Sequence, residues 1–86
     1  MKPKTRELMR AGRKILEQQL KGNPHSIELN NALDAWDRLE KNFTGENYSR
    51  APLAIMEASL LGELSSKQLR TISRKLEAAW KAEIGQ

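Results

Sequence analysis

The sequence contains no cysteine, which excludes disulfide bonds and thiolate metal sites and leaves stability to side-chain packing. It also lacks an apolar stretch that approaches the roughly 20 residues of a membrane-spanning helix. The opening MKPKTRELMR has none of the continuous apolar segment that is typical of a secretory signal. We therefore expect a cytoplasmic protein that has no membrane partner.

Residues suited to catalysis are also few. The single histidine, His25, has no nucleophile or acid at a recognisable spacing, and the glycines are isolated instead of forming a phosphate-binding loop. Asp34 and Asp37 could approach a metal ion together with Glu28 or Glu40, but no His or Cys joins them at ligand spacing. We expect a protein that is not an enzyme and uses no cofactor and no metal.

The apolar residues that are present follow the helical period. A chain of 86 residues can build one hydrophobic core, and no alternating strand pattern occurs in it. The sequence thus predicts an all-α fold, a compact bundle that forms a single helical domain over residues 1–86. The expected four helices span about residues 5–21, 24–43, 50–61 and 65–84, the third being short.

The first two helices have recognisable ends. Thr5 is the expected N-cap of the first helix, and Gly22 ends it. Gly12 inside that helix costs roughly 1 kcal/mol relative to alanine, so it marks either a close helix crossing or a weak first turn. Asn23, before a proline, is the expected cap of the second helix, with Ser26 as the alternative.

The third helix is predicted from less local evidence. The segment TGENYSR, residues 44–50, has the composition of a turn and reads as a loop. Pro52 fits the first turn of a helix that follows it, because the missing N–H has no intrahelical acceptor there. That helix is expected to turn Leu53, Met56 and Leu60 toward the core, with Leu61 as a further candidate.

The fourth helix has the strongest start signal in the chain. Ser65 and Gln68 have the spacing of a capping box, and Leu64 and Leu69 have that of a hydrophobic staple across it. From there an apolar stripe continues to the C-terminal end of the helix at Gly85. The opposite side of the same helix is basic.

The charge is unevenly distributed. Residues 1–25 carry a net +5, residues 26–64 a net −4 and residues 65–86 a net +3. One interpretation is that basic outer helices lie against an acidic middle helix, through exposed ion pairs of about 0 to 1 kcal/mol each. The other is that a basic face binds an anionic partner.

Nucleic-acid binding is the first functional hypothesis, because the element order of residues 56–76 is that of a helix-turn-helix, although its apolar positions are displaced by about one residue. In that motif the second helix enters the major groove. The expected contact residues on the fourth helix are Lys67, Gln68, Arg70, Thr71, Arg74 and Lys81. A second basic surface on the first helix would comprise Arg6, Arg10 and Arg13.

The alternative hypothesis is a protein-binding adaptor or inhibitor that acts through an exposed helical surface, either as a monomer or as a homodimer. Trp36 and Trp80 occupy core-type positions, and either would be an interface anchor if it were partly exposed. Met9, Leu20 and Leu61 flank the main apolar stripes and could form a second apolar patch.

Overall fold

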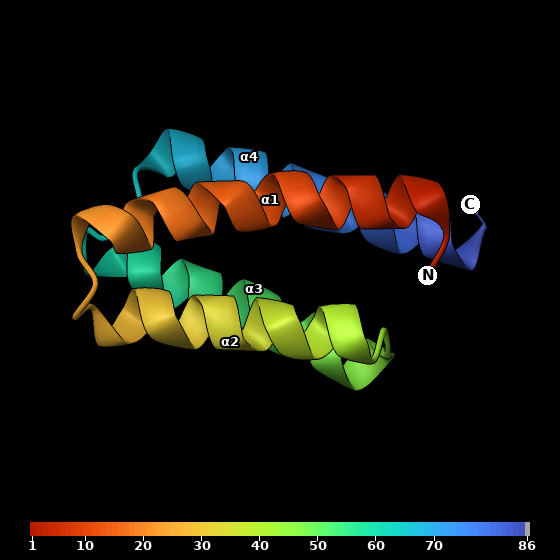
Figure 1. The fold of residues 1–86 in the computed structure, drawn as a ribbon, viewed down its shortest axis with the longest axis horizontal. Helices are drawn as coiled ribbons and strands as arrows, with labels where there is room; N and C mark the ends of the chain where they lie inside the picture. The colour runs from red at the N-terminus through yellow and green to blue at the C-terminus, as the bar shows by residue number, and fades with distance from the viewer. Residues whose placement is uncertain (86) are drawn as a thin grey trace.

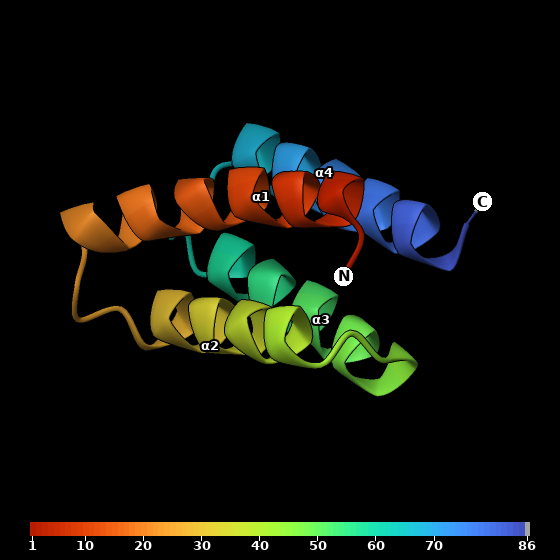
Figure 2. The same cartoon turned by 45° about the vertical axis from the view of Figure 1, so that its right-hand side comes forward.

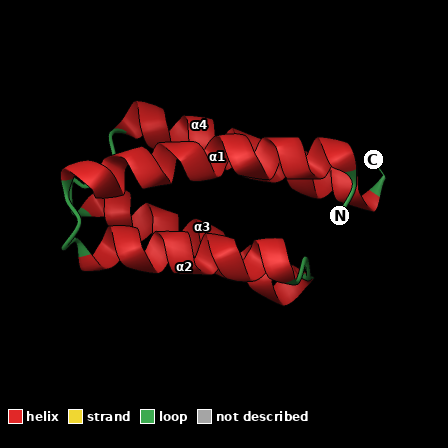
Figure 3. Ribbon diagram, in the orientation of Figure 1, coloured by secondary structure: helices red, strands yellow, loops and turns green. Residues whose placement is uncertain are grey.

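The computed structural model describes residues 1–85 and shows an all-α bundle of four helices, which confirms the predicted fold class (Figure 1). No strand occurs within those residues, and short loops join the helices (Figure 3). The helices are α1 (Pro3–Gly22), α2 (Ile27–Lys41), α3 (Gly45–Leu60) and α4 (Ser66–Ile84).

Successive helices run in opposite directions and form two layers. α1 lies beside α4 in one layer and α2 beside α3 in the other, as two views of the ribbon show (Figures 1 and 2). The start of α1 meets the end of α4, where the Lys2 amide donates a 2.9 Å hydrogen bond to Glu83 Oε1. In the described part of the chain, no helix is both long enough and apolar enough to cross a lipid bilayer.

The core lies between the two layers and draws on all four helices. It is apolar and dominated by aliphatic side chains, with one tryptophan as its largest member. Its fully or almost fully buried members are Met9, Leu16, Leu29, Ala32, Trp36, Leu39, Ala51, Ile55, Ala58, Leu64, Ile72, Leu76 and Ala79.

Gly12 marks a close crossing of α1 and α2, one of the two roles expected for it. A Cβ atom at Gly12 would lie 2.5 Å from Trp36 Cζ2, far inside van der Waals contact. The Trp36 indole N–H donates to the Met9 carbonyl oxygen at 2.9 Å, which fixes the ring against α1. The missing side chain of Gly12 is therefore the space that the indole occupies.

Two predicted caps are wrong, because the helices begin at other residues. α1 begins at Pro3, so Thr5 lies inside the helix, fully buried and with no hydrogen-bond partner for its hydroxyl in the described residues. α2 begins after Ser26, whose hydroxyl accepts the Leu29 N–H at 3.1 Å; Asn23 instead caps the C-terminal end of α1. His25 consequently lies in the exposed turn between the helices.

The prediction of a short third helix is also wrong. α3 begins at Gly45, inside the segment that was predicted to be a loop, and Thr44 caps it by accepting the Asn47 N–H at 3.2 Å. Pro52 thus lies in the helix interior, where it removes one backbone donor. Packing compensates, because Tyr48 in the early turns stacks on Trp80 of α4 with ring centroids 4.5 Å apart.

The inward face of α3 differs from the predicted one as well. Ala51, Ile55 and Ala58 are buried, whereas Leu53 and Leu60 are exposed. Small residues let α3 approach its neighbours closely, and the larger side chains are left on the outside.

The predicted second apolar patch of Met9, Leu20 and Leu61 does not form. Met9 is fully buried in the core and Leu20 packs against the core, so that only Leu61 is exposed.

α4 has the predicted start. The Ser65 hydroxyl accepts the Gln68 N–H at 3.1 Å, and the Gln68 side chain accepts the Ser65 N–H at 2.9 Å, which completes the capping box. Leu64 is buried beside this turn and Leu69 packs against the core. Gly85 ends the helix with a positive φ of 82°, a conformation that glycine adopts without strain.

Candidate binding surfaces

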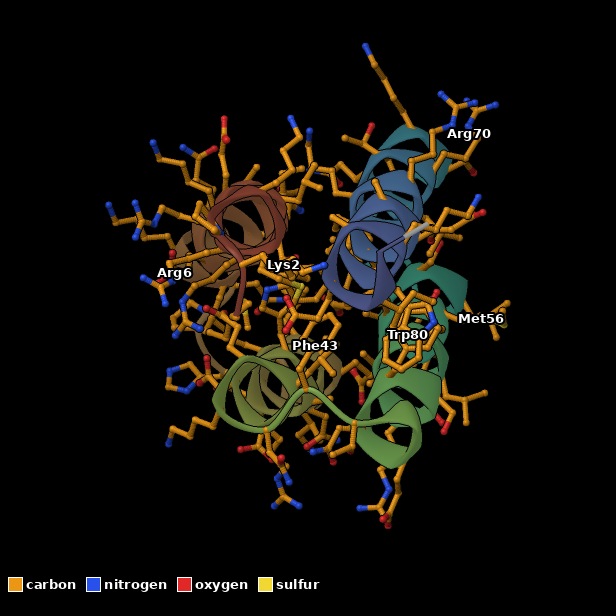
Figure 4. All side chains as sticks on the ribbon, turned by 90° about the vertical axis from the view of Figure 1, so that its right-hand side faces the viewer. Lys2, Arg6, Phe43, Met56, Arg70 and Trp80 are labelled. Atoms are coloured by element: carbon orange, nitrogen blue, oxygen red, sulfur yellow. The ribbon has the colours of Figure 1, made fainter. Side chains whose placement is uncertain are left out.

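The basic row of α4 is exposed. Burial of Ile72 and Leu76 fixes the rotation of the helix, so that Lys67, Arg70 and Arg74 lie on the side away from the core. None of these three cations forms an ion pair with a carboxylate of residues 1–85. Figure 4 shows the Arg70 side chain projecting away from the bundle. We call Lys67, Arg70 and Arg74 the α4 basic row.

The other predicted residues of α4 have partners within the chain. Gln68 is held in the capping box, and the Thr71 hydroxyl donates to the Lys67 carbonyl oxygen at 3.0 Å. Lys81 Nζ lies 3.0 Å from Glu77 Oε1 on the exposed surface. An exposed pair of this kind is weak and leaves the lysine accessible, but it lowers the net charge around it.

Arg13 is the predicted basic residue whose environment differs most from expectation. Its guanidinium forms an ion pair with Asp37 and lies 2.8 Å from Glu40 Oε1, both on α2, while Glu17 approaches at 3.5 Å. The hydrogen bond to Asp37 raises the pKa of Arg13 above its ordinary value. Arg13 therefore connects α1 to the acidic α2, as the intramolecular interpretation of the charge pattern predicts, and it is not a free surface cation.

Arg6 and Arg10 are exposed on α1, but they do not extend the α4 basic row. In Figure 4 the Arg6 side chain projects from the side of the bundle opposite to Arg70. Neither arginine forms an ion pair within the described residues. In the described part of the chain, cations without an ion pair thus lie on two separate surfaces, one on α1 and one on α4.

The outer face of α3 carries an apolar surface that the sequence pattern did not predict. Leu53 is 63% exposed, Met56 49% and Leu60 78%. Their spacing of three and four residues places them on one side of the helix, directly opposite Ala51, Ile55 and Ala58. We call Leu53, Met56 and Leu60 the α3 apolar stripe. Leu61, 64% exposed, follows its C-terminal end.

The α3 apolar stripe has chemically different flanks. On one flank, Asn47 and Arg50 line a shallow hollow together with residues of α2. On the other, Tyr48 stacks on Trp80 and brings α4 alongside. Figure 4 shows Met56 and Arg70 projecting on the same side of the bundle. The stripe therefore faces solvent next to the helix that carries the α4 basic row.

The two tryptophans differ in environment. Trp36 is fully buried, as expected for a core residue. Trp80 is half-buried at one end of the bundle, where it stacks on Tyr48 and on Phe43, whose ring centroid is 5.6 Å away. Trp80 is thus partly exposed and meets the condition for an interface anchor, whereas Trp36 does not. The most exposed large apolar side chains within the described residues are aliphatic.

The inner face of α3 could in principle have indicated the stripe. Ala51, Ile55 and Ala58 share the spacing of a core stripe, but their combined hydrophobicity is lower than that of Leu53, Met56 and Leu60. A comparison of side-chain size alone favours the wrong face.

Comparison of the chain with protein-family models, with curated proteins and with solved structures finds no match.

Proposed function

We propose that this protein is a non-catalytic helical module that binds another protein through the α3 apolar stripe. The supporting observation is the exposure of three large apolar side chains on one continuous helix face. Isolated apolar residues are common on protein surfaces, whereas a contiguous row on a helix is typical of an interaction site. Burying a fully exposed side chain of this kind contributes about 1.5–3 kcal/mol, and these side chains, already partly covered, contribute less.

The test is affinity capture on the immobilised chain from nuclease-treated lysate of the native host, followed by binding measurements with the purified partner. We expect the double variant Leu53→Ser, Leu60→Ser to weaken binding by at least about tenfold. The control is Ile27→Ser, because Ile27 is 68% exposed but lies on α2. Equal affinity of the wild type and the double variant would contradict the proposal.

Nucleic-acid binding is the second candidate, and the exposed, unpaired α4 basic row favours it. It ranks below protein binding because a phosphate backbone neutralises cations but leaves the α3 apolar stripe in water. If nucleic acid is the target, affinity for duplex DNA or RNA should fall steeply between about 50 and 200 mM salt. Replacing Arg70 and Arg74 by alanine should reduce that salt dependence by roughly one per lost contact. A gel shift at low salt without binding would remove this candidate.

A further inference from the structure

We infer that the partner of the α3 apolar stripe is an amphipathic helix with acidic residues along one edge. Its apolar side chains pack on Leu53, Met56 and Leu60, and its carboxylates face the α4 basic row. The inference rests on the proposed function and specifies the partner's chemistry. Three properties of the surface support it: its size, its shape and the charges beside it.

The size of the stripe indicates that the partner also covers part of α4. A stable interface buries about 800 Å² on each partner, more than three side chains of one helix supply. On the Tyr48 side, the exposed surface next to the stripe belongs to α4, because the stacking of Tyr48 on Trp80, with centroids 4.5 Å apart, holds the two helices side by side. On the other side it belongs to α2. A partner that extends over this part of α4 comes close to Arg70, which projects on the same side of the bundle as Met56 (Figure 4).

The shape of the surface favours a helix as the covering element. The described residues contain no strand, so no sheet edge is available to which an extended peptide could add. Side chains three and four residues apart on α3 form a ridge, and such a ridge packs into the groove of another helix. A helical partner can then present apolar residues at the same spacing along its length.

The charges next to the stripe favour an acidic partner. The three cations of the α4 basic row have no partner within residues 1–85, whereas the charges nearest the other flank are partly neutralised, with Arg50 Nη2 2.8 Å from Glu46 Oε1. Carboxylates placed opposite unpaired cations speed association and exclude basic competitors. An acidic edge on one side of the partner helix also fixes its orientation across the stripe.

A second copy of the chain fits this surface less well. Each copy carries a formal charge of +4. Of the carboxylates near the stripe, Glu46 and Glu77 are already paired within the described chain, which leaves Glu57 to meet three cations of the other copy. A symmetric dimer would bury the leucines but bring two basic rows close together.

The experiment selects helical peptides from a display library on the immobilised full-length protein. The library holds an alanine-rich helical scaffold in which the surface positions are randomised over apolar, acidic, basic and neutral polar residues, without a charge bias. We expect the enriched peptides to share apolar residues at helical spacing and acidic residues along one edge. Enrichment of neutral or basic peptides, or of none, would overturn the inference.

Variants of the protein then locate the contacts of a selected peptide. We expect about tenfold weaker binding by Leu60→Ser and also by the double charge reversal Arg70→Glu, Arg74→Glu. The control is Lys14→Glu, Lys21→Glu, which makes the same charge change on the exposed part of α1 and should alter affinity less than about twofold. A peptide whose acidic residues are changed to lysine should regain affinity for the charge-reversed protein.

The outcomes separate this inference from the proposed function. If Leu60→Ser weakens binding and the charge reversal does not, the partner is apolar but not acidic, and only the inference fails. If neither change weakens binding, both fail. Sedimentation of the protein alone supplies a further test: a wild-type dimer that Leu60→Ser converts to a monomer would show that a second copy covers the stripe, and would overturn the inference.

Discussion

Replacing Gly12 by alanine tests how closely α1 and α2 approach each other. In the interior of an exposed helix this change is stabilising, because alanine forms helix more readily than glycine by about 1 kcal/mol. Here the new methyl group would lie 2.5 Å from Trp36 Cζ2 and 2.6 Å from Cη2. Because Trp36 is fully buried and its N–H is bonded to the Met9 carbonyl, the rigid ring cannot turn away freely.

The two effects oppose each other, and the steric one should dominate. Inserting a methyl group into a well-packed core typically costs about 1–3 kcal/mol, and contact with two atoms of a rigid ring belongs at the upper end of that range. After subtracting the helix-propensity gain, we expect Gly12→Ala to lower the free energy of unfolding by about 2 kcal/mol. In a chain of this size that corresponds to a decrease in Tm of roughly 8–16 °C.

The assay is urea unfolding followed by far-ultraviolet circular dichroism, which does not depend on the tryptophans. Gly22→Ala is the control, because a Cβ atom there has nothing within 4 Å, so the change should be neutral or slightly stabilising. In a Trp36→Phe background, which lacks the two contacted ring atoms, Gly12→Ala should no longer destabilise. A Gly12→Ala variant as stable as Gly22→Ala would refute the close crossing.

Three further predictions follow from the ion pairs, the aromatic cluster and the helix cap. Arg13→Met should cost about 1–2 kcal/mol of stability, against almost none for Arg6→Met, because only Arg13 holds carboxylates of another helix. Burial raises the pKa of Tyr48 above its ordinary value of 10.0. Because the unfolded chain loses this proton at a lower pH than the folded chain, the free energy of unfolding should fall as the pH rises above about 10. Tyr48→Phe should lessen that fall. Phenolate absorbance reports the titration, because the chain has one tyrosine. Ser65→Ala should cost about 1 kcal/mol in urea unfolding, whereas the mid-helix change Ser73→Ala should be nearly neutral.

Features encoded by adjacent residues could be predicted from the sequence. The start of α4 is the clearest case, because both partners of the capping box lie within one helical turn. The existence of four helices follows likewise from apolar periodicity. The cap at Ser26 was one of two local alternatives, and the choice between Ser26 and Asn23 depends on how α1 ends.

Features that depend on distant residues could not be predicted. Nothing near Tyr48 in the sequence indicates that it stacks on Trp80, and that contact helps to hold a helix where the composition favours a turn. Arg13 has the spacing of a surface cation, yet Asp37 and Glu40 approach it from another helix. The sequence pattern likewise places the α3 apolar stripe in the core, because its exposure depends on the neighbouring helices and not on adjacent residues.

The candidate site was partly predictable. Periodicity alone places Lys67, Arg70 and Arg74 on the outer side of α4, and the structure agrees. Which face of α3 is exposed depends on how closely α2 and α4 approach it, and that spacing is set by the small residues Ala51 and Ala58. Residue size and helical spacing cannot supply this information without the neighbouring helices.

The pairing of α1 with α4 has a consequence for the order in which the chain folds. These two helices lie side by side although they stand at opposite ends of the sequence, while α2 and α3 are joined by a short turn. Closing a long loop costs more entropy than closing a short one. We therefore expect the α2–α3 hairpin to form early and the docking of the two outer helices to complete folding.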